Sequence, residues 1–168
     1  TLDPFLDARV LADERERFLT LVERRLTERV PAAYLTGEAW LQGHRFSVDS
    51  RVIVPRSPIA ELLADYLAPW ISDPDSIELV LDLCTGSGCL AVLAALAYPN
   101  AQVDAVDISD NALEVADENI EQFGLDGRVT THRSDLFEQM PSCEYDLIVC
   151  NPPYVNSHSM ESLPAEYR

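Results

Sequence analysis

The chain has 168 residues, 47% of them hydrophobic, and a formal net charge of −17, which comes from 29 acidic residues against 12 arginines and no lysine. This apolar content is sufficient for a packed core and excludes a disordered tail, and no apolar run approaches the ~20 residues of a membrane helix. The acidic surface repels phosphate backbones and favours a basic protein partner over a nucleic acid, although adaptation to salt explains the same charge equally well.

The N-terminal part is predicted to hold one helix and one hairpin. Residues 13–29 carry apolar side chains at helical spacing with charges between them, and Val30-Pro31 ends this helix. Residues 38–41 and 45–48 are the expected arms of the hairpin, joined by a turn at Gln42-Gly43-His44.

From residue 57 onwards, helix and strand patterns alternate. Ser57 is expected to cap a helix that has Pro58 at its first position. Ser109 is expected to cap another helix, which Gly124 closes. The expected strands are residues 77–83, 102–106, 128–132 and 146–150, and the expected helices are residues 59–67, 90–98 and 110–123. This order predicts an α/β fold with a mostly parallel sheet.

The first of these strands leads into a glycine-rich turn and then into a helix. In this arrangement, Cys84-Thr85-Gly86-Ser87-Gly88-Cys89 places a ligand against backbone N–H groups at a helix N-terminus. Gly86, Gly88 and Ala91 also fit the dinucleotide fingerprint G-x-G-x-x-A, a weak signal on its own. Asp82, at the strand end, would repel a pyrophosphate but suits a cationic amino-acid group.

The next two strands also lead into acidic residues. Asp107 can accept hydrogen bonds from both ribose hydroxyls, which suits NAD and S-adenosylmethionine equally. Asp135 can accept from an adenine amino group, with Leu136 and Phe137 flanking the base. Each acid alone is as well explained as an ordinary polar strand end. Together with the glycine turn, however, they predict a nucleoside cofactor at the carboxyl edge of the sheet.

The motif Asn151-Pro152-Pro153-Tyr154 follows the last apolar run, and its two prolines end the strand. The Asn151 side-chain oxygen and the Pro152 carbonyl can hold both N–H bonds of a planar –NH2 group, while Tyr154 stacks on it. Such a clamp aims a poorly nucleophilic nitrogen at an electrophile and requires no strongly shifted acid or base. The alternative is an ordinary Pro-Pro loop with Tyr154 packed on the core. The motif predicts methyl transfer to nitrogen and favours S-adenosylmethionine over a nicotinamide.

These motifs together resemble the HemK/PrmB-type N5-glutamine methyltransferases, over nearly the whole chain. The segments that carry the resemblance are residues 34–40, 54–61, 82–89, 104–109 and 151–154. Arg56-Ser57-Pro58 and the glycine turn are similar to the branch that methylates the third large-subunit ribosomal protein; the release-factor branch usually has Pro-Arg-Pro-Asp-Thr-Glu at the former place. The resemblance implies a Rossmann-like class I methyltransferase fold and S-adenosyl-L-methionine as the cofactor.

Motifs and resemblance together assign residues to each part of the site. The expected cofactor-binding residues are Asp82, Cys84, Thr85, Gly86, Ser87, Gly88, Asp107, Asp135, Leu136 and Asn151. Asn151, Pro152 and Tyr154 are the expected catalytic residues and, with Pro153, form the expected glutamine site. No metal site is expected, because the three histidines lack metal-ligand spacing, and the four cysteines contain no C-x-x-C pair and are expected to be reduced thiols.

The chain departs from the family pattern at both ends, and only four of the seven strands of a class I methyltransferase are counted. We therefore expect a truncated chain that is weakly active or inactive alone, with residues 1–33 the remnant of a helical domain, 34–56 a hairpin and linker, and 57–168 a partial methyltransferase domain. The leading hypothesis is a cytoplasmic enzyme that methylates a glutamine of a basic ribosomal protein. The alternatives are a release-factor glutamine methyltransferase, an adenine-N6 DNA or RNA methyltransferase, a nicotinamide-dependent oxidoreductase, and a non-catalytic fragment that only binds.

Overall fold

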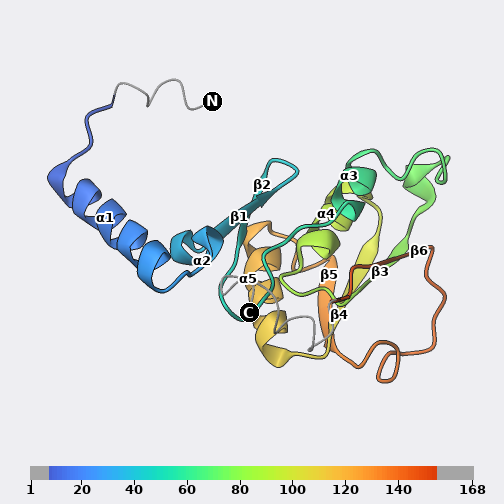
Figure 1. The fold of residues 1–168 in the computed structure, drawn as a ribbon. Helices are drawn as coiled ribbons and strands as arrows, with labels where there is room; N and C mark the ends of the chain where they lie inside the picture. The colour runs from blue at the N-terminus through green and yellow to red at the C-terminus, as the bar shows by residue number, and fades with distance from the viewer. Residues whose placement is uncertain (1–7, 155–168) are drawn as a thin grey trace. The chain divides into compact units, whose positions relative to one another are not determined.

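The computed structural model describes residues 8–154, which divide into two compact units (Figure 1). The first unit extends to Thr36 and contains α1 (Ala12–Thr27) and α2 (Ala32–Thr36). Helix α1 confirms the helix predicted at residues 13–29, whereas α2 was not predicted. No side chain of α1 is buried, so the apolar stripe expected on this helix is exposed, as at Phe18 and Leu26.

The second unit, Gly37–Tyr154, contains the remaining elements. They are the hairpin strands β1 (Glu38–Leu41) and β2 (His44–Ser47), the helices α3 (Ile59–Ala64), α4 (Cys89–Ala97) and α5 (Asp110–Gln122), the 3-10 helix η2 (Pro74–Ser76), and the strands β3 (Leu79–Leu83), β4 (Gln102–Asp107), β5 (Val129–Arg133) and β6 (Leu147–Cys150). No helix in the described part of the chain is long and apolar enough to cross a membrane.

The hairpin has a tighter turn than the sequence predicted. Leu41 pairs with His44, so Gln42 and Gly43 alone form the turn, with φ angles of 49° and 77°. Positive φ at both central residues is the geometry of a two-residue type I′ turn, whose twist matches that of the strands. The prediction that placed His44 in the turn is therefore wrong by one residue.

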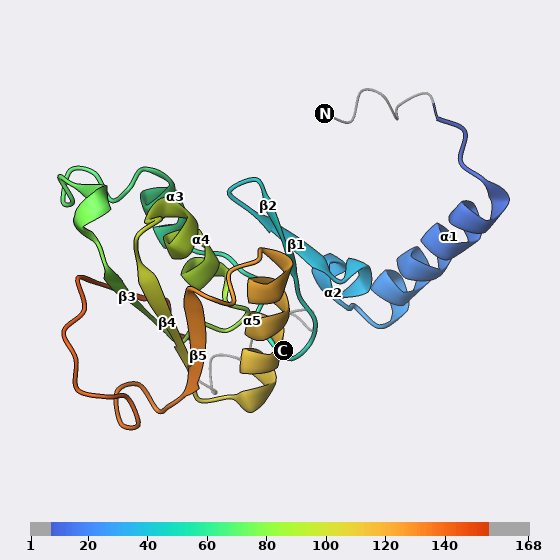
Figure 2. The same cartoon turned by 180° about the vertical axis from the view of Figure 1, so that it is seen from behind.

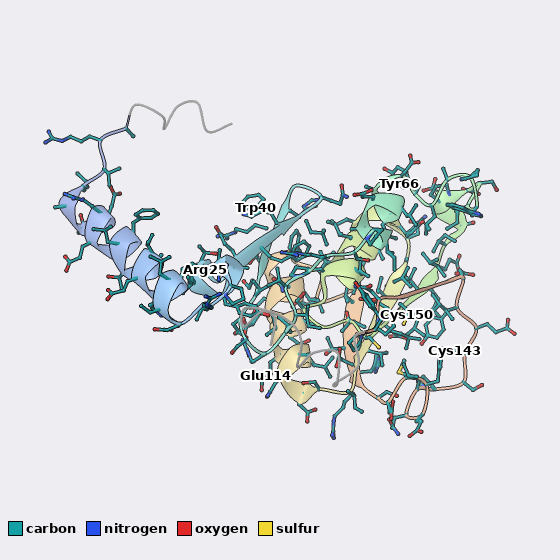
Figure 3. The ribbon with its side chains drawn as sticks, viewed as in Figure 1. Arg25, Trp40, Tyr66, Glu114, Cys143 and Cys150 are labelled. Carbon is teal, nitrogen blue, oxygen red and sulfur yellow. The ribbon has the colours of Figure 1, made fainter. Side chains whose placement is uncertain are left out.

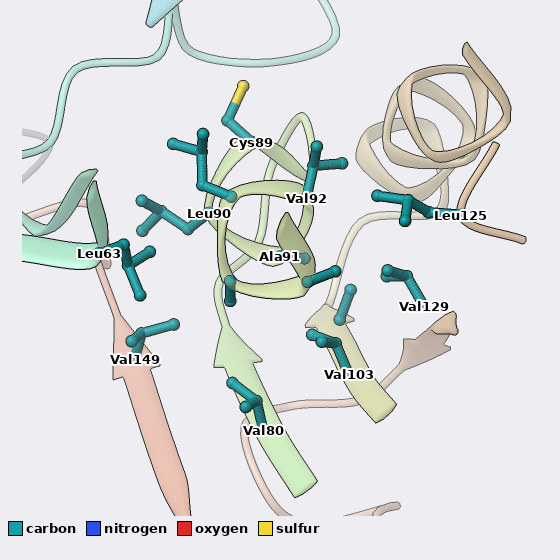
Figure 4. Close-up of a cluster of buried hydrophobic side chains, with 14 of the residues drawn as sticks. Leu63, Val80, Cys89, Leu90, Ala91, Val92, Val103, Leu125, Val129 and Val149 are labelled. Atoms are coloured by element: carbon teal, nitrogen blue, oxygen red, sulfur yellow. The ribbon is translucent and has the colours of Figure 1, made fainter. Parts of the chain in front are cut away.

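The four strands β3–β6 form one parallel sheet in the order β5-β4-β3-β6, which confirms the predicted parallel α/β architecture (Figure 2). Helix α4 has the sequence CLAVLAALA, and seven of its nine residues are buried. An all-apolar helix is expected where a helix is enclosed by other elements rather than packed on one side. In Figure 4, Val80, Val103, Val129 and Val149 of the four strands point toward α4 and its neighbours.

One predicted helix cap is confirmed and one is displaced by a residue: Ser109 is the N-cap of α5, whereas the N-cap of α3 is Pro58 and not Ser57. The predicted helix ends are wrong at α1, which ends at Thr27 instead of residue 29, and at α3. Ser57 Oγ accepts a hydrogen bond from the Ile59 N–H at 3.2 Å, and Ser109 Oγ accepts from the Ala112 N–H at 3.3 Å. Helix α3 ends at Ala64 instead of residue 67, because the backbone beyond it turns into the left-handed region, with Leu67 at a φ of 54°. Leu67 is nevertheless partly buried against the core. Its apolar side chain is therefore explained by this packing and not by membership of the helix.

Candidate active site

The sheet register brings the glycine turn and the proline-flanked asparagine to the same edge. Strands β3 and β6 are parallel neighbours, with Leu83 paired to Cys150. The residues that follow these two strands, Cys84 and Asn151, therefore begin loops at the same carboxyl edge of the sheet. The Asn151 amide also donates a long hydrogen bond of 3.5 Å to the carbonyl of Arg56, 95 positions away in the sequence.

The glycine turn is held against β4 by Asp107. The Thr85 N–H donates to the Val106 carbonyl at 2.9 Å, which continues the pairing of β3 with β4 beyond the strand. The Gly86 N–H then donates to Asp107 Oδ2 at 2.9 Å, while the Ser109 N–H donates to Oδ1 at 3.0 Å. Each carboxylate oxygen accepts more than one hydrogen bond, so these two bonds leave Asp107 with acceptor capacity for a ligand.

The two glycines of the turn serve different purposes. Both have positive φ angles, 55° at Gly86 and 75° at Gly88. A Cβ atom on Gly88 would lie 3.0 Å from the Cβ of Ala116, so this glycine permits the close approach of α4 and α5. A Cβ atom on Gly86 would meet nothing within 4 Å. Open space beside the backbone therefore exists at Gly86, whereas Gly88 is required by packing.

Asp82 lies behind the turn as a completely buried carboxylic acid. Its Oδ2 accepts a hydrogen bond of 2.6 Å from the Thr85 hydroxyl, whereas its Oδ1 is buried and has no partner among the described residues. Burial raises the pKa of Asp82 to about 7, and the Thr85 hydrogen bond only partly opposes this effect. A buried acid at the end of a central strand, with one unsatisfied oxygen, is typical of a functional site rather than of a structural one.

The cysteines near the turn are neutral thiols. Burial raises the pKa of Cys84 to about 11 and that of Cys89 to about 12. Neither supplies a thiolate at neutral pH, so the site has no cysteine nucleophile in the turn. All four cysteines are unpaired, as expected from the sequence, and Figure 3 shows Cys143 on the β5–β6 connection and Cys150 at the end of β6.

The connection after β5 presents the third group of predicted residues. The Asp135 N–H donates to the Gln139 side chain at 2.8 Å, and the Ser134 hydroxyl donates to the Leu136 carbonyl at 2.8 Å. These bonds hold Leu136 at a φ of 49°, with the side chains of Leu136 and Phe137 48% and 55% exposed. The exposed apolar pair is accessible to a planar ligand at the β5 end of the edge.

The clamp residues are accessible at the opposite end. Asn151 is half-buried, and Pro152 and Pro153 are exposed. Tyr154 is 89% exposed. Tyr154 is therefore not packed on the core of the described residues, contrary to that part of the alternative interpretation, and its ring is accessible for stacking.

The sequence reasoning missed Asn119 of α5, which is fully buried and hydrogen-bonded to both Ser47 and Ser87. One signal was available, because Asn119 lies three positions after Ala116 and four before Phe123, on the face predicted to be apolar. A polar residue on a buried face requires partners.

A second polar cluster lies away from the carboxyl edge. Asp104 Oδ1 is hydrogen-bonded to His132 Nε2 at 2.8 Å, and Asp104 Oδ2 accepts a hydrogen bond from the Tyr145 hydroxyl at 2.7 Å. Burial, followed by a hydrogen bond to Cys143, raises the pKa of Tyr145. The adjacent cavity of about 680 Å³ is lined by Phe137, Met140, Pro141, Ser142, Cys143, Glu144, Tyr145 and Ile148. Of the residues proposed to flank a ligand, only Phe137 lines it. Within residues 8–154, no group of three or more His, Cys, Asp or Glu side chains is arranged to hold a metal ion.

Solved structures of low sequence identity show the same fold. The delta-N METTL16 methyltransferase domain superposes with a TM-score of 0.54 at 18% identity, over 82% of this chain and 58% of that one. An S-adenosylmethionine-dependent methyltransferase from Agrobacterium tumefaciens superposes with a TM-score of 0.53 at 26% identity, over 69% of this chain and 39% of that one. The sheet and its helices are those of a Rossmann-like class I methyltransferase.

Curated relatives are closer in sequence. The chain is 68% identical over 168 residues to a ribosomal protein uL3 glutamine methyltransferase of Bordetella pertussis, and 59% identical to one of Burkholderia pseudomallei. Both alignments include all of this chain, which spans 56% and 57% of the length of those two proteins. The methyltransferase small domain family matches residues 61–165, more than half of the chain. The chain therefore belongs to the methyltransferase small domain family.

Proposed function

We propose that this chain carries the site for S-adenosylmethionine-dependent N5-methylation of a glutamine side chain in the large-subunit ribosomal protein uL3. One observation carries the proposal: the pairing of Leu83 with Cys150 sets the glycine turn beside Asn151-Pro152-Pro153-Tyr154. A cofactor seated on the turn and an amide held by the clamp then meet at one edge of the sheet.

The residues present fit the proposed cofactor. Four neighbouring strands at about 4.8 Å spacing give an edge of roughly 14 Å, suited to a ligand with a base at one end and an amino acid at the other. Leu136 would flank the base, Asp107 would accept from the ribose hydroxyls, and Gly86 leaves room for close approach of a ligand to the backbone. Asp82 is fully buried, so it attracts a cationic amino group through the turn rather than by direct contact.

When bound, S-adenosylmethionine supplies an electrophilic methyl group on a sulfonium centre. The chain's own residues orient the acceptor nitrogen. The Asn151 oxygen and the Pro152 carbonyl accept the two N–H bonds of the glutamine amide, and Tyr154 stacks on its plane. These acceptors also stabilise the positive charge that develops on nitrogen during transfer. The proton leaves afterwards to water, so no thiolate, metal ion or shifted base is required.

Charge and relatives support the choice of substrate. A chain with a formal net charge of −17 attracts a basic protein and repels nucleic acid. The curated relatives from Bordetella pertussis and Burkholderia pseudomallei are uL3 glutamine methyltransferases. A ribosomal protein that is methylated before assembly would meet the enzyme in the cytoplasm.

Mass spectrometry of candidate substrates tests this proposal. The protein is incubated with S-adenosylmethionine carrying a deuterated methyl group and, in separate reactions, with uL3, a release factor or RNA. We expect the label on one glutamine side chain of uL3. Because the chain spans just over half of its relatives' length, the same reactions are run with a form extended to that length. Label in the release factor, in adenine, or in none of the three with either form, would refute the proposed substrate.

A further inference from the structure

Asn119 is a buried amide with an unusually complete set of partners. Its Oδ1 accepts from the Ser47 N–H at 2.7 Å. Its Nδ2 donates to the Ser47 carbonyl at 3.0 Å and to the Ser87 carbonyl at 2.8 Å. Both N–H bonds and one oxygen lone pair are thus used, and the side chain is 0% exposed. The pairing with Ser47 occupies both backbone groups of that residue, as a neighbouring strand would.

The two partners of Asn119 belong to different parts of the unit. Ser47 is the last residue of β2, 72 positions away, and Ser87 lies in the glycine turn, 32 positions away. Both views of the ribbon show the hairpin beside α5 (Figures 1 and 2). A single side chain of α5 therefore joins the hairpin to the turn that we assign to the cofactor.

The bond to Ser87 determines how a peptide plane of the turn is oriented. The Ser87 carbonyl and the Gly88 N–H belong to one planar peptide group. Asn119 holds the carbonyl at 2.8 Å, and the Thr85 carbonyl accepts from the Gly88 N–H at 3.0 Å. A turn with glycines at positions 86 and 88 has many accessible conformations, and this peptide is fixed from both sides. Without Asn119, the Ser87 carbonyl would be buried without this partner, and the peptide plane would be held only by the bond from the Gly88 N–H to the Thr85 carbonyl.

We infer that Asn119 is a positioning residue for the cofactor turn, which it holds in its binding conformation by using the β1–β2 hairpin as an anchor. The inference rests on the proposed function, since it assumes that the turn holds S-adenosylmethionine. The hairpin contributes no predicted cofactor contact and acts on the turn through Asn119. By linkage, the cofactor in turn strengthens the attachment of the hairpin to α5.

Gln122 provides a matched control on the same helix. Its Nε2 donates to the Arg45 carbonyl at 2.8 Å, and its Oε1 accepts from the Ser47 hydroxyl at 3.3 Å. It thus binds the hairpin, and within the described residues its side-chain hydrogen bonds go to the hairpin and not to the turn. Replacing Gln122 by alanine removes hairpin contacts alone, whereas replacing Asn119 by alanine removes hairpin and turn contacts together.

Titration calorimetry with S-adenosylhomocysteine distinguishes the effect of losing the turn contact from that of losing hairpin contacts alone. The titrations are run at a temperature at which circular dichroism shows each variant to be folded. We expect Asn119→Ala to weaken binding roughly tenfold, as for a buried acceptor left unpaired, and Gln122→Ala to change it less than about twofold on the same scale. The KM for S-adenosylmethionine should rise in Asn119→Ala with little change in kcat. Equal affinities in the wild type and Asn119→Ala would overturn the inference while leaving the proposed function intact. Failure of the wild type to bind would overturn both.

Two further measurements apply if Asn119→Ala does not fold. Asn119→Asp keeps the volume and the acceptor for the Ser47 N–H but lacks the amide that donates to the carbonyls of Ser47 and Ser87, and it should also bind S-adenosylhomocysteine about tenfold more weakly. In the wild type, the side-chain N–H signals of Asn119 and the backbone N–H signal of Ser47 should shift in the ¹H–¹⁵N spectrum when S-adenosylhomocysteine is added. Signals that stay unchanged at saturation would show that the hairpin anchor is not coupled to the cofactor.

Discussion

Replacing Asp82 by asparagine should remove a pH-dependent loss of stability. Asp82 is fully buried, and burial raises its pKa from 3.8 to about 7. Because the folded-state pKa is the higher one, the folded protein binds this proton more tightly than the unfolded chain does. Ionisation of the buried acid therefore destabilises the folded protein. The free energy of unfolding falls as pH rises above about 4, and this loss levels off above about pH 7. The shift of about 3 units corresponds to roughly 4 kcal/mol.

About half of that cost, roughly 2 kcal/mol, develops between pH 5.5 and pH 8. Urea unfolding is measured for the wild type and Asp82→Asn across this pH range. The free energy of unfolding of the variant, relative to that of the wild type, should rise by about that amount between pH 5.5 and pH 8. Any destabilisation by the new amide donor does not vary with pH. The change of the unfolding free energy with pH therefore reports the ionisation of Asp82 alone. Asp126→Asn, a change at an exposed acid, is the control and should leave the slope unchanged. Parallel curves for the wild type and Asp82→Asn would refute the buried ionisation.

Four further substitutions test the roles of single residues. Asn151→Ala should lower kcat by about 10²–10³ with little change in S-adenosylhomocysteine affinity, since the amide orients the acceptor; near-normal turnover would remove the clamp from the mechanism. Asp107→Ala should weaken S-adenosylhomocysteine binding about tenfold or more in calorimetry, because it removes a ligand acceptor and the bond to the Gly86 N–H; unchanged affinity would exclude that role. Gly88→Ala should lower the free energy of unfolding by about 2–4 kcal/mol, because a Cβ would lie 3.0 Å from that of Ala116 at a φ of 75°. Gly86→Ala should lose only about 1–2 kcal/mol, and equal losses in urea unfolding would contradict the packing role of Gly88.

Apolar runs were sufficient to predict β3 (LVLDL) and β6 (LIVC), as is typical of strands in a parallel sheet. No such run marks β5 (VTTHR), which has a single apolar residue. The ends of elements were less predictable. Leu67 continues the apolar face of α3, yet its backbone is left-handed, and nothing in the local sequence distinguishes a buried residue in a helix from one just beyond it. At the hairpin, the pairing of Leu41 with His44 depends on the twist of the strands and on both turn residues.

The place of the candidate site residues in the fold was predictable where those residues are contiguous in the sequence. Residues of the glycine turn and of the Asn151 motif are contiguous, and the end of a parallel strand places each at a known edge. Two aspects were not predictable because they depend on long-range packing. Gly88 is required by Ala116 of another helix, and Asn119 is required by Ser47 and by the turn. The periodicity of α5 indicates that Asn119 needs buried partners, but nothing in the flanking residues identifies those partners or the contact of Gly88 with Ala116.

A crystal structure with S-adenosylhomocysteine and a glutamine-containing peptide tests the central claim most directly. We expect the cofactor along the carboxyl edge, with its ribose on Asp107 and its sulfur facing Asn151 and Pro152. The glutamine nitrogen should face the sulfur, with room between the two atoms for the methyl group that S-adenosylhomocysteine lacks. A cofactor bound elsewhere, for example in the cavity beside Met140 and Tyr145, or a glutamine held away from Asn151, would contradict the account.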